Sequence, residues 1–383
     1  MKKLLLFYGF VFLCGVLLMA QGIEGLVPVG LEFEIINGRS VTITGYTGNA
    51  ATVNIPAQIQ GLPVTTIGDS AFNGHIMLTS ITIPSSVTSI GDAAFLNCIS
   101  LTSIFVPPSV TSIGDAAFQG CMDLTSIIID NRNPAYTSID DVLFDKNVRT
   151  LIKFPEGKTA SAYTIPSSVT SLDIDAIREC RNLTSIIIPS SVTSIDSFAF
   201  FSCYSLTSIT VDSRNPVYVS IDGVLFNKNI QTIISYPAAR STETFVIPSS
   251  VSSIGDGAFS GCSSLTSITI PSSVTSIGDW AFSYSSSLIS ITLPSSISSI
   301  SDGTFYDCSS LSSIMIPSTV TSIGDIVFSG CHSLTSIDIP SSVTSIGYRA
   351  FARCSNLTSV TLSRRTQVGE GAFPETAQIV YRD

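Results

Sequence analysis

The chain repeats one pattern of apolar and polar positions with a period of 23 residues. A proline follows each apolar run and marks the period, at Pro248, Pro271, Pro294, Pro317 and Pro340. A period this regular predicts one small structural unit stacked many times, in which each unit contacts mainly its neighbours. The usual division of a 383-residue chain into separate globular domains therefore does not apply.

Each unit predicts two extended segments separated by a turn. The first, for example Leu265 to Ile270, alternates apolar and polar residues and is rich in β-branched side chains, which is typical of a strand. Its Leu and Ile positions are expected to face inward, and its Ser and Thr positions outward. Proline and two serines then turn the chain into the second segment, for example Val274 to Ile277.

The rest of the unit predicts a bend and a short helix that brings a phenylalanine into the core. A glycine such as Gly278 permits a tight bend, and Asp279 after it is a good N-cap for a short helix that carries Phe282. The phenylalanines at this position are expected to form the spine of the core: Phe72, Phe95, Phe118, Phe200, Phe259, Phe282, Phe305, Phe328, Phe351 and Phe373.

The ends of the chain depart from the repeat. Residues 31–36 and 41–44 alternate around Asn37-Gly38, which is the strongest short signal for a β-hairpin. The expected divisions are an N-terminal hairpin cap, the repeat array and a C-terminal cap, over residues 21–63, 64–362 and 363–383.

Two longer units interrupt the array. Each has 36 residues, at about 130–166 and 212–248, and in each an aspartate replaces the proline. They are copies of one another, since Arg-Asn-Pro-x-Tyr-x-Ser-Ile-Asp-x-Val-Leu-Phe occurs in both. Tyr136 and Tyr218 occupy the same place in the two copies, in what we expect to be surface loops.

The repeat pattern LxxIxIP-xxVxxIGxxAFxxC, seen from Leu101 to Cys121 and from Leu334 to Cys354, resembles that of the BspA-like leucine-rich repeat family. The resemblance extends from about residue 31 to the end of the chain. It implies a right-handed, curved leucine-rich repeat solenoid, β-rich with short helical or turn segments, and the unit count predicts about 13 coils. It also implies a surface or secreted protein that adheres to host or neighbouring cells. The family has no universal binding residues, so none is transferred to this chain.

The first twenty residues predict a secretory signal. Lys2 and Lys3 precede an apolar run from Leu4 to Met19, and Ala20 ends an imperfect cleavage site. An uncleaved anchor is the alternative, although the run is short for a membrane span. We therefore expect a secreted or cell-surface protein that is not inserted in the membrane once the signal at residues 1–20 is removed.

Composition and charge exclude some classes of function. Only 12% of residues are charged, the formal net charge is −10 and the pI is near 4.6, which argues against a nucleic-acid partner. The chain has two histidines, His75 and His332, and no Ser/His/Asp arrangement stands out from the repeat. No glycine-rich phosphate loop occurs either. We expect neither an enzyme nor a cofactor.

One cysteine per coil recurs at the end of the unit. An even number of cysteines in a secreted protein admits disulfides. Their inward position and the replacement of one by Ser285 favour buried free thiols, and a straight row cannot enclose a tetrahedral metal ion. The members of the row are Cys98, Cys121, Cys180, Cys203, Cys262, Cys308, Cys331 and Cys354.

A row of aspartates follows the glycines of the bends. It admits a cation-binding edge or a set of helix caps, and capping is favoured because each charge would sit at its own helix N-terminus. We therefore expect no metal site. The members are Asp69, Asp92, Asp115, Asp256, Asp279, Asp302 and Asp325.

The outward strand positions matter most for binding. Most are threonine, but Phe105, Ile128 and Ile187 are apolar and fall within four consecutive coils. They predict an exposed apolar patch of the kind that marks partner sites, unless the long-unit loops cover it. We expect non-covalent binding of a protein or glycan through the concave sheet and the loops around Tyr136 and Tyr218. The alternatives are a self-associating structural surface protein without a ligand, and binding of ice or a carbohydrate by the Ser-x-Thr grid.

Overall fold

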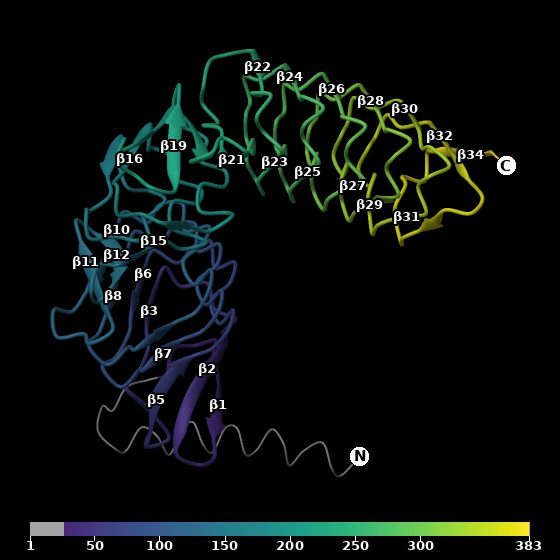
Figure 1. Cartoon of the computed structure of the whole chain (residues 1–383). Coiled ribbons are helices and arrows are strands. Elements are labelled where there is room, and N and C mark those ends of the chain that lie inside the picture. Colours follow the sequence, from purple (N-terminus) through teal and green to yellow (C-terminus); the bar gives the residue numbers. More distant parts are fainter. Residues whose placement is uncertain (1–26, 383) are drawn as a thin grey trace, which may run out of the picture.

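The chain forms a curved β-solenoid of about 15 turns (Figure 1). The structure, a computed structural model, describes residues 27–382, so the signal expected at residues 1–20 lies outside the described residues. Within 27–382 every regular element is a strand, and no helix is long and apolar enough to cross a membrane. The turn count is slightly above the 13 coils expected, because the end segments add turns of their own.

The first extended segment of each unit builds a ladder of parallel strands, which we call the first ladder. Its strands are β3 (Thr52–Asn54), β6 (Ser80–Thr82), β8 (Ser103–Val106), β10 (Ser126–Ile129), β14 (Ala162–Thr164), β16 (Ser185–Ile188), β18 (Ser208–Val211), β22 (Thr244–Val246), β24 (Ser267–Thr269), β26 (Ser290–Thr292), β28 (Ser313–Met315), β30 (Ser336–Asp338), β32 (Ser359–Ser363) and β34 (Gln378–Arg382). As expected, Ile268 of β24 is buried and Thr269 is exposed.

The second extended segment builds the second ladder, also parallel. Its strands are β2 (Ser40–Tyr46), β5 (Leu62–Ile67), β7 (Ser89–Ile90), β9 (Ser112–Ile113), β13 (Thr150–Lys153), β15 (Ser171–Leu172), β17 (Ser194–Ile195), β21 (Thr232–Ser235), β23 (Ser253–Ile254), β25 (Ser276–Ile277), β27 (Ser299–Ile300), β29 (Ser322–Ile323), β31 (Ser345–Ile346) and β33 (Gln367–Val368). At the N-terminal end, β1 (Leu31–Ile36) and β4 (Gln58–Ile59) pair antiparallel with β2 and β5.

The third side of each coil consists of turns, and the expected short helices are absent from the described residues. In most of the short units two residues on this side, such as Ala93 and Asn97, have a positive φ, which interrupts a right-handed helix. The backbone N–H groups then point to the next coil, as in the bond from Phe72 N to the carbonyl oxygen of Ala94. This side is therefore a third stack of hydrogen bonds between coils.

The aspartate row does not cap helices, so this expectation is wrong. In five of the seven aspartates the carboxylate accepts a backbone N–H from the following coil, as that of Asp69 does from Asp92 N at 2.9 Å. The glycine beside it is required by close packing, since a Cβ on Gly91 would collide with the Asp69 carboxylate. Gly91 is not among the residues with positive φ. The Gly-Asp pair that recurs in the repeat thus stacks one coil on the next.

The phenylalanine spine consists of two stacks. Phe72, Phe95 and Phe118 stack at ring distances of 5.4 and 5.8 Å, and a longer stack runs from Tyr236 through Phe259 to Phe373. Between the two stacks the row contains Phe154, Ile177 and Phe200, all buried. The buried core forms three clusters, and the two boundaries between them lie in the two long units, where the stacks of rings also end.

Each long unit inserts an antiparallel hairpin in front of a strand of the second ladder. β11 (Tyr136–Ile139) and β12 (Val142–Asp145) precede β13, and β19 (Tyr218–Ile221) and β20 (Val224–Asn227) precede β21. The third side of the long unit is then shorter than in the short units. Only Ile152 and Lys153 separate Leu151 from Phe154, whereas the short units have four residues at this place.

The curvature places the two ladders on different edges of the arc. From β22 to β34 the first ladder follows the outer edge in Figure 1, and the strands from β23 to β31 follow the inner edge. For this half of the chain the first ladder is therefore not the concave face that the sequence analysis expected.

Candidate binding surfaces

Two of the three apolar strand residues lie side by side. Phe105 on β8 and Ile128 on β10 are register partners, and their exposed fractions are 48% and 44%. The neighbouring hairpin β11–β12 leaves them open to solvent. Ile187 on β16 is 45% exposed, but its register partners are Thr164 and Thr210. The structure thus forms an apolar pair, Phe105 and Ile128, with Ile187 apart from it.

The two tyrosines of the long units are structural. Tyr218 is buried, with 8% exposure, so its expected role in binding from a surface loop is wrong. Tyr136 is half-buried, and its phenol oxygen accepts a hydrogen bond from the backbone N–H of Ile113 at 3.0 Å. Ile113 ends a run of the second ladder at β9, where the next strand of that ladder belongs to the long unit. The phenol supplies the acceptor that a following strand would have supplied.

A buried asparagine explains the Arg-Asn-Pro sequence shared by the long units. Asn133 donates through its amide to the carbonyl oxygens of Pro107 and Val110, and its Oδ1 accepts from Ala135 N and Tyr136 N. Asn215 makes the equivalent four bonds in the second copy. The motif is visible in the sequence, and the structure shows that its asparagine fixes the start of the hairpin.

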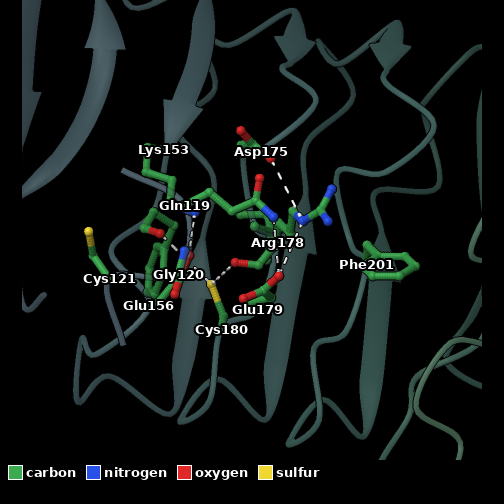
Figure 2. A network of polar contacts seen from close by, with 12 residues as sticks. Gln119, Gly120, Cys121, Lys153, Glu156, Asp175, Arg178, Glu179, Cys180 and Phe201 are labelled. Carbon is green, nitrogen blue, oxygen red and sulfur yellow. Dashed lines mark hydrogen bonds and ion pairs between the residues drawn. The ribbon is translucent and has the colours of Figure 1, made fainter. Parts of the chain in front are cut away.

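A polar network that sequence analysis missed lies on the third side of the coils around the first long unit (Figure 2). Because this unit is short on that side, residues of the coils before and after it come together. Arg178 pairs with Glu179 at 3.3 Å and with Asp175 at 3.9 Å, and its guanidinium lies 4.7 Å from the ring centre of Phe201. The amide of Gln119 lies beside Arg178 and Glu179, although Gln119 precedes them by about 60 residues.

An ion pair is buried beneath this network. Lys153 Nζ lies 2.9 Å from Glu156 Oε1, and the side chains are only 4% and 0% exposed. The backbone N–H of Gly120 donates to the same carboxylate oxygen at 2.9 Å. Burial raises the pKa of the Glu156 carboxyl, and the Lys153 ammonium opposes that shift. The pair fills the place where a short unit would have further turns, so its role is structural.

Aromatic side chains continue from this network across the same side. We name Phe198, Phe201, Trp280, Tyr284 and Tyr306 the aromatic row. Phe201 meets Phe198 and Trp280 in edge-to-face contacts at 5.5 and 6.5 Å, and Tyr306 meets Trp280 and Tyr284 at 5.2 and 5.4 Å. Trp280 and Tyr306 are partly exposed.

The aromatic row departs from the repeat at positions that usually hold small residues. Trp280 stands where the two neighbouring coils have Gly257 and Gly303, and Tyr284 stands where they have Gly261 and Asp307. This contrast between coils was visible in the sequence. Only the structure brings Phe201 and Trp280 together, because they are 79 positions apart and a long unit lies between them.

The cysteines of the repeat are buried free thiols. Each donates to a backbone carbonyl of the preceding coil, as Cys98 Sγ does to the Phe72 oxygen at 3.0 Å. Burial raises the pKa of Cys98 to about 12. Among the described residues no group of three or more His, Cys, Asp or Glu side chains is placed to hold a metal ion.

Comparison with known proteins supports the fold. The model of the BspA type leucine rich repeat region, in six copies, matches residues 47–163, 154–242, 235–358 and 284–381. A leucine rich cell surface protein from Faecalibacterium prausnitzii is 32% identical, with a TM-score of 0.51, over 90% of this chain and 96% of the other. The pneumococcal vaccine antigen PcpA is 21% identical, with a TM-score of 0.50, over 94% of each chain. No curated protein sequence matches this chain.

Proposed function

The chain belongs to the BspA-type leucine-rich repeat family, and on that premise we propose that it is a secreted or cell-surface binding protein. It binds a protein or glycan of host or neighbouring cells without covalent chemistry, using the solenoid as a rigid support. The description of the Faecalibacterium prausnitzii relative as a cell surface protein supports the location.

The apolar pair carries this proposal. Phe105 and Ile128 lie next to each other on a ladder whose exposed positions are mostly threonine and serine. Burying the remaining half of each side chain in an interface contributes about 1 kcal/mol per residue. Adjacent exposed apolar residues on a soluble surface mark a place where another molecule gains by covering them.

Binding to host cells and to immobilised matrix proteins and glycans tests the proposal. The double variant F105T/I128T should lose most of the binding, because it restores the threonine of the other coils and removes the apolar pair. M315T is the matched control, since Met315 is exposed at the same coil position on β28. Equal binding by F105T/I128T and the unmodified chain, with equal thermal stability, contradicts the role of the pair.

Self-association is the second candidate, and strand β34 favours it. β34 is the last strand of the first ladder in the described chain, and Ile379, Val380 and Tyr381 on it are 37%, 45% and 49% exposed. An apolar edge strand is a template for pairing with another chain. Sedimentation over a range of concentrations should then show assembly that V380K abolishes. A monomer at every concentration removes this candidate.

A further inference from the structure

The second long unit leaves a hollow between two complete coils. Its volume is about 450 Å³, which is within the range of small-molecule sites. Thr232 and Ile234 of β21 lie in it, Ser197 comes from the coil before, and Asp256 and Asp279 come from the two coils after.

The hollow exists because the long unit omits a corner of the coil. Only Ile234 and Ser235 separate Ile233 from Tyr236, whereas the neighbouring short units have four residues there. The coils on either side keep their full corners and form two walls. In the first long unit, the following coil carries Asp173 and Ile174 at the places of Gly255 and Asp256.

The walls combine hydroxyl groups with carboxylates over an apolar floor. Ser197, Ser253 and Ser276 supply hydroxyls, of which that of Ser276 donates to that of Ser253 at 2.9 Å, and the lining residues include no lysine or arginine. Asp256 Oδ1 accepts from Asp279 N at 2.9 Å, which holds this wall in place. Burial and the neighbouring carboxylates of Asp256 and Asp302 raise the pKa of Asp279.

A partly exposed aromatic side chain, which is not among the residues lining the hollow, stands next to its wall in the sequence. Trp280 follows Asp279 of the wall, and its indole lies on the neighbouring coil at Gly303. A Cβ on Gly303 would lie 2.6–2.8 Å from three ring atoms of Trp280, so one face of the indole covers this glycine. Phe201 and Tyr306 also contact the indole, which is still partly exposed.

We propose that this hollow binds a neutral oligosaccharide that extends past Asp279, with the exposed part of the Trp280 indole packed against one sugar ring. A sugar presents an apolar C–H face, which suits the indole, and many hydroxyl groups, which suit the mixture of serines and carboxylates. The absence of basic residues from the lining and the presence of Asp256 and Asp279 disfavour an anionic sugar. The inference deepens the proposed function, on which it rests, by giving the scaffold a glycan site separate from the apolar pair.

A basic peptide is the competing ligand, because two carboxylates also attract lysine. The lining favours the saccharide, since hydroxyl groups are present on both walls whereas both carboxylates lie on one. The carboxylate of Asp256 is also engaged with the backbone.

Titration calorimetry with the full chain tests the proposal. The probes are neutral cello-, malto- and N-acetylchito-tetraoses, an oligogalacturonate as the anionic probe, and tetralysine. At least one neutral tetrasaccharide should bind, and W280G should weaken it about tenfold. This variant is compatible with the fold because Gly257 and Gly303 occupy the same position in the adjacent coils.

A second variant, T232Y, places a large side chain in the hollow and should abolish saccharide binding. T150Y is its matched control, because Thr150 holds the same place in the first long unit. Failure of all neutral probes, binding of tetralysine alone, or unchanged affinity in T232Y overturns the proposal. Binding of F105T/I128T to host material is measured in a separate experiment, so the proposal for the apolar pair and the proposal for the hollow can be rejected independently.

Discussion

The hydroxyl of Ser285 donates a hydrogen bond to the carbonyl oxygen of Phe259 at 2.8 Å, and this bond replaces the one that a cysteine makes in other coils. One coil later, Cys308 Sγ donates to the Phe282 oxygen at 3.1 Å. The position therefore requires a small buried donor aimed at the preceding coil. A thiol and a hydroxyl both meet that requirement, which explains the single serine in the cysteine row.

We predict that C308S preserves stability to within about 1 kcal/mol, whereas C308A costs about 1–3 kcal/mol because the Phe282 carbonyl loses its donor. Denaturant unfolding monitored by circular dichroism measures both. S285C, the reverse exchange, is the control and should also be tolerated. Equal stability of C308A and C308S contradicts a hydrogen-bonding role for this position.

The thiols also predict a loss of stability at alkaline pH. Burial raises the pKa of Cys98 and of Cys354 to about 12, above the value of about 8.5 in an unfolded chain. A raised thiol pKa means that the folded state favours the neutral form. The contribution of each buried thiol to the free energy of unfolding is complete below pH 8.5 and is lost as the pH rises towards 12.

Thermal unfolding between pH 7 and 11 should show this decline, and a thiol reagent at pH 8 should label the folded chain only after denaturation. C98S/C354S should reduce the pH dependence in part, because the other buried thiols, such as Cys262 and Cys308, also have a raised pKa. Rapid labelling of these thiols without unfolding is the contrary result.

The buried ion pair predicts a non-additive double variant. E156A leaves the Lys153 ammonium buried without its partner and should cost about 3–5 kcal/mol. K153S/E156A should be less destabilised than E156A alone, because the second long unit has Ser235 and Ala238 at these places. Chemical unfolding of the two single variants and the double variant measures the coupling. If the losses of stability in the two single variants simply add up to the loss in the double variant, the two side chains are not coupled.

The aspartates that replace proline in the long units predict that the protein loses some stability at acid pH. Hydrogen bonds from Arg132 lower the pKa of Asp130 to about 2, and Arg214 does the same for Asp212. Because the folded state favours the carboxylate, this contribution is complete above pH 4 and is lost as the pH falls to 2. Carboxyl chemical shifts should titrate near pH 2 for these two residues, and R132Q should raise the pKa of Asp130 part of the way to its ordinary value, because the backbone N–H of residue 132 still donates to this carboxylate. A midpoint near pH 4 in the unmodified chain contradicts the paired geometry.

Much of the fold was predictable because each coil repeats the same choice of buried and exposed positions. The alternation that places Ile268 inside and Thr269 outside follows from side-chain geometry in a strand, and the structure has it. The third side was not predictable in the same way. The Asp-x-Ala-Phe segment suits a helix N-terminus, but the coil must place two left-handed residues there to bring its N–H groups to the next coil.

The candidate sites were predictable only in part. The exposed apolar pair followed from counting along the repeat, since Phe105 and Ile128 occupy one position in successive coils. The burial of Tyr218 did not follow, because it depends on how the hairpin folds against the end of β17. The hollow at Asp256 and Asp279 depends on a corner that the second long unit omits.

By itself, the sequence determined the solenoid, its ladders, its core positions and its family pattern. These are set residue by residue through the burial of apolar side chains at a fixed period. Only the tertiary structure decided which departures from the repeat meet, such as Phe201 with Trp280 and Gln119 with Arg178. The physical reason is that the long units shorten one side of the coil, so residues 60–80 positions apart come into contact there.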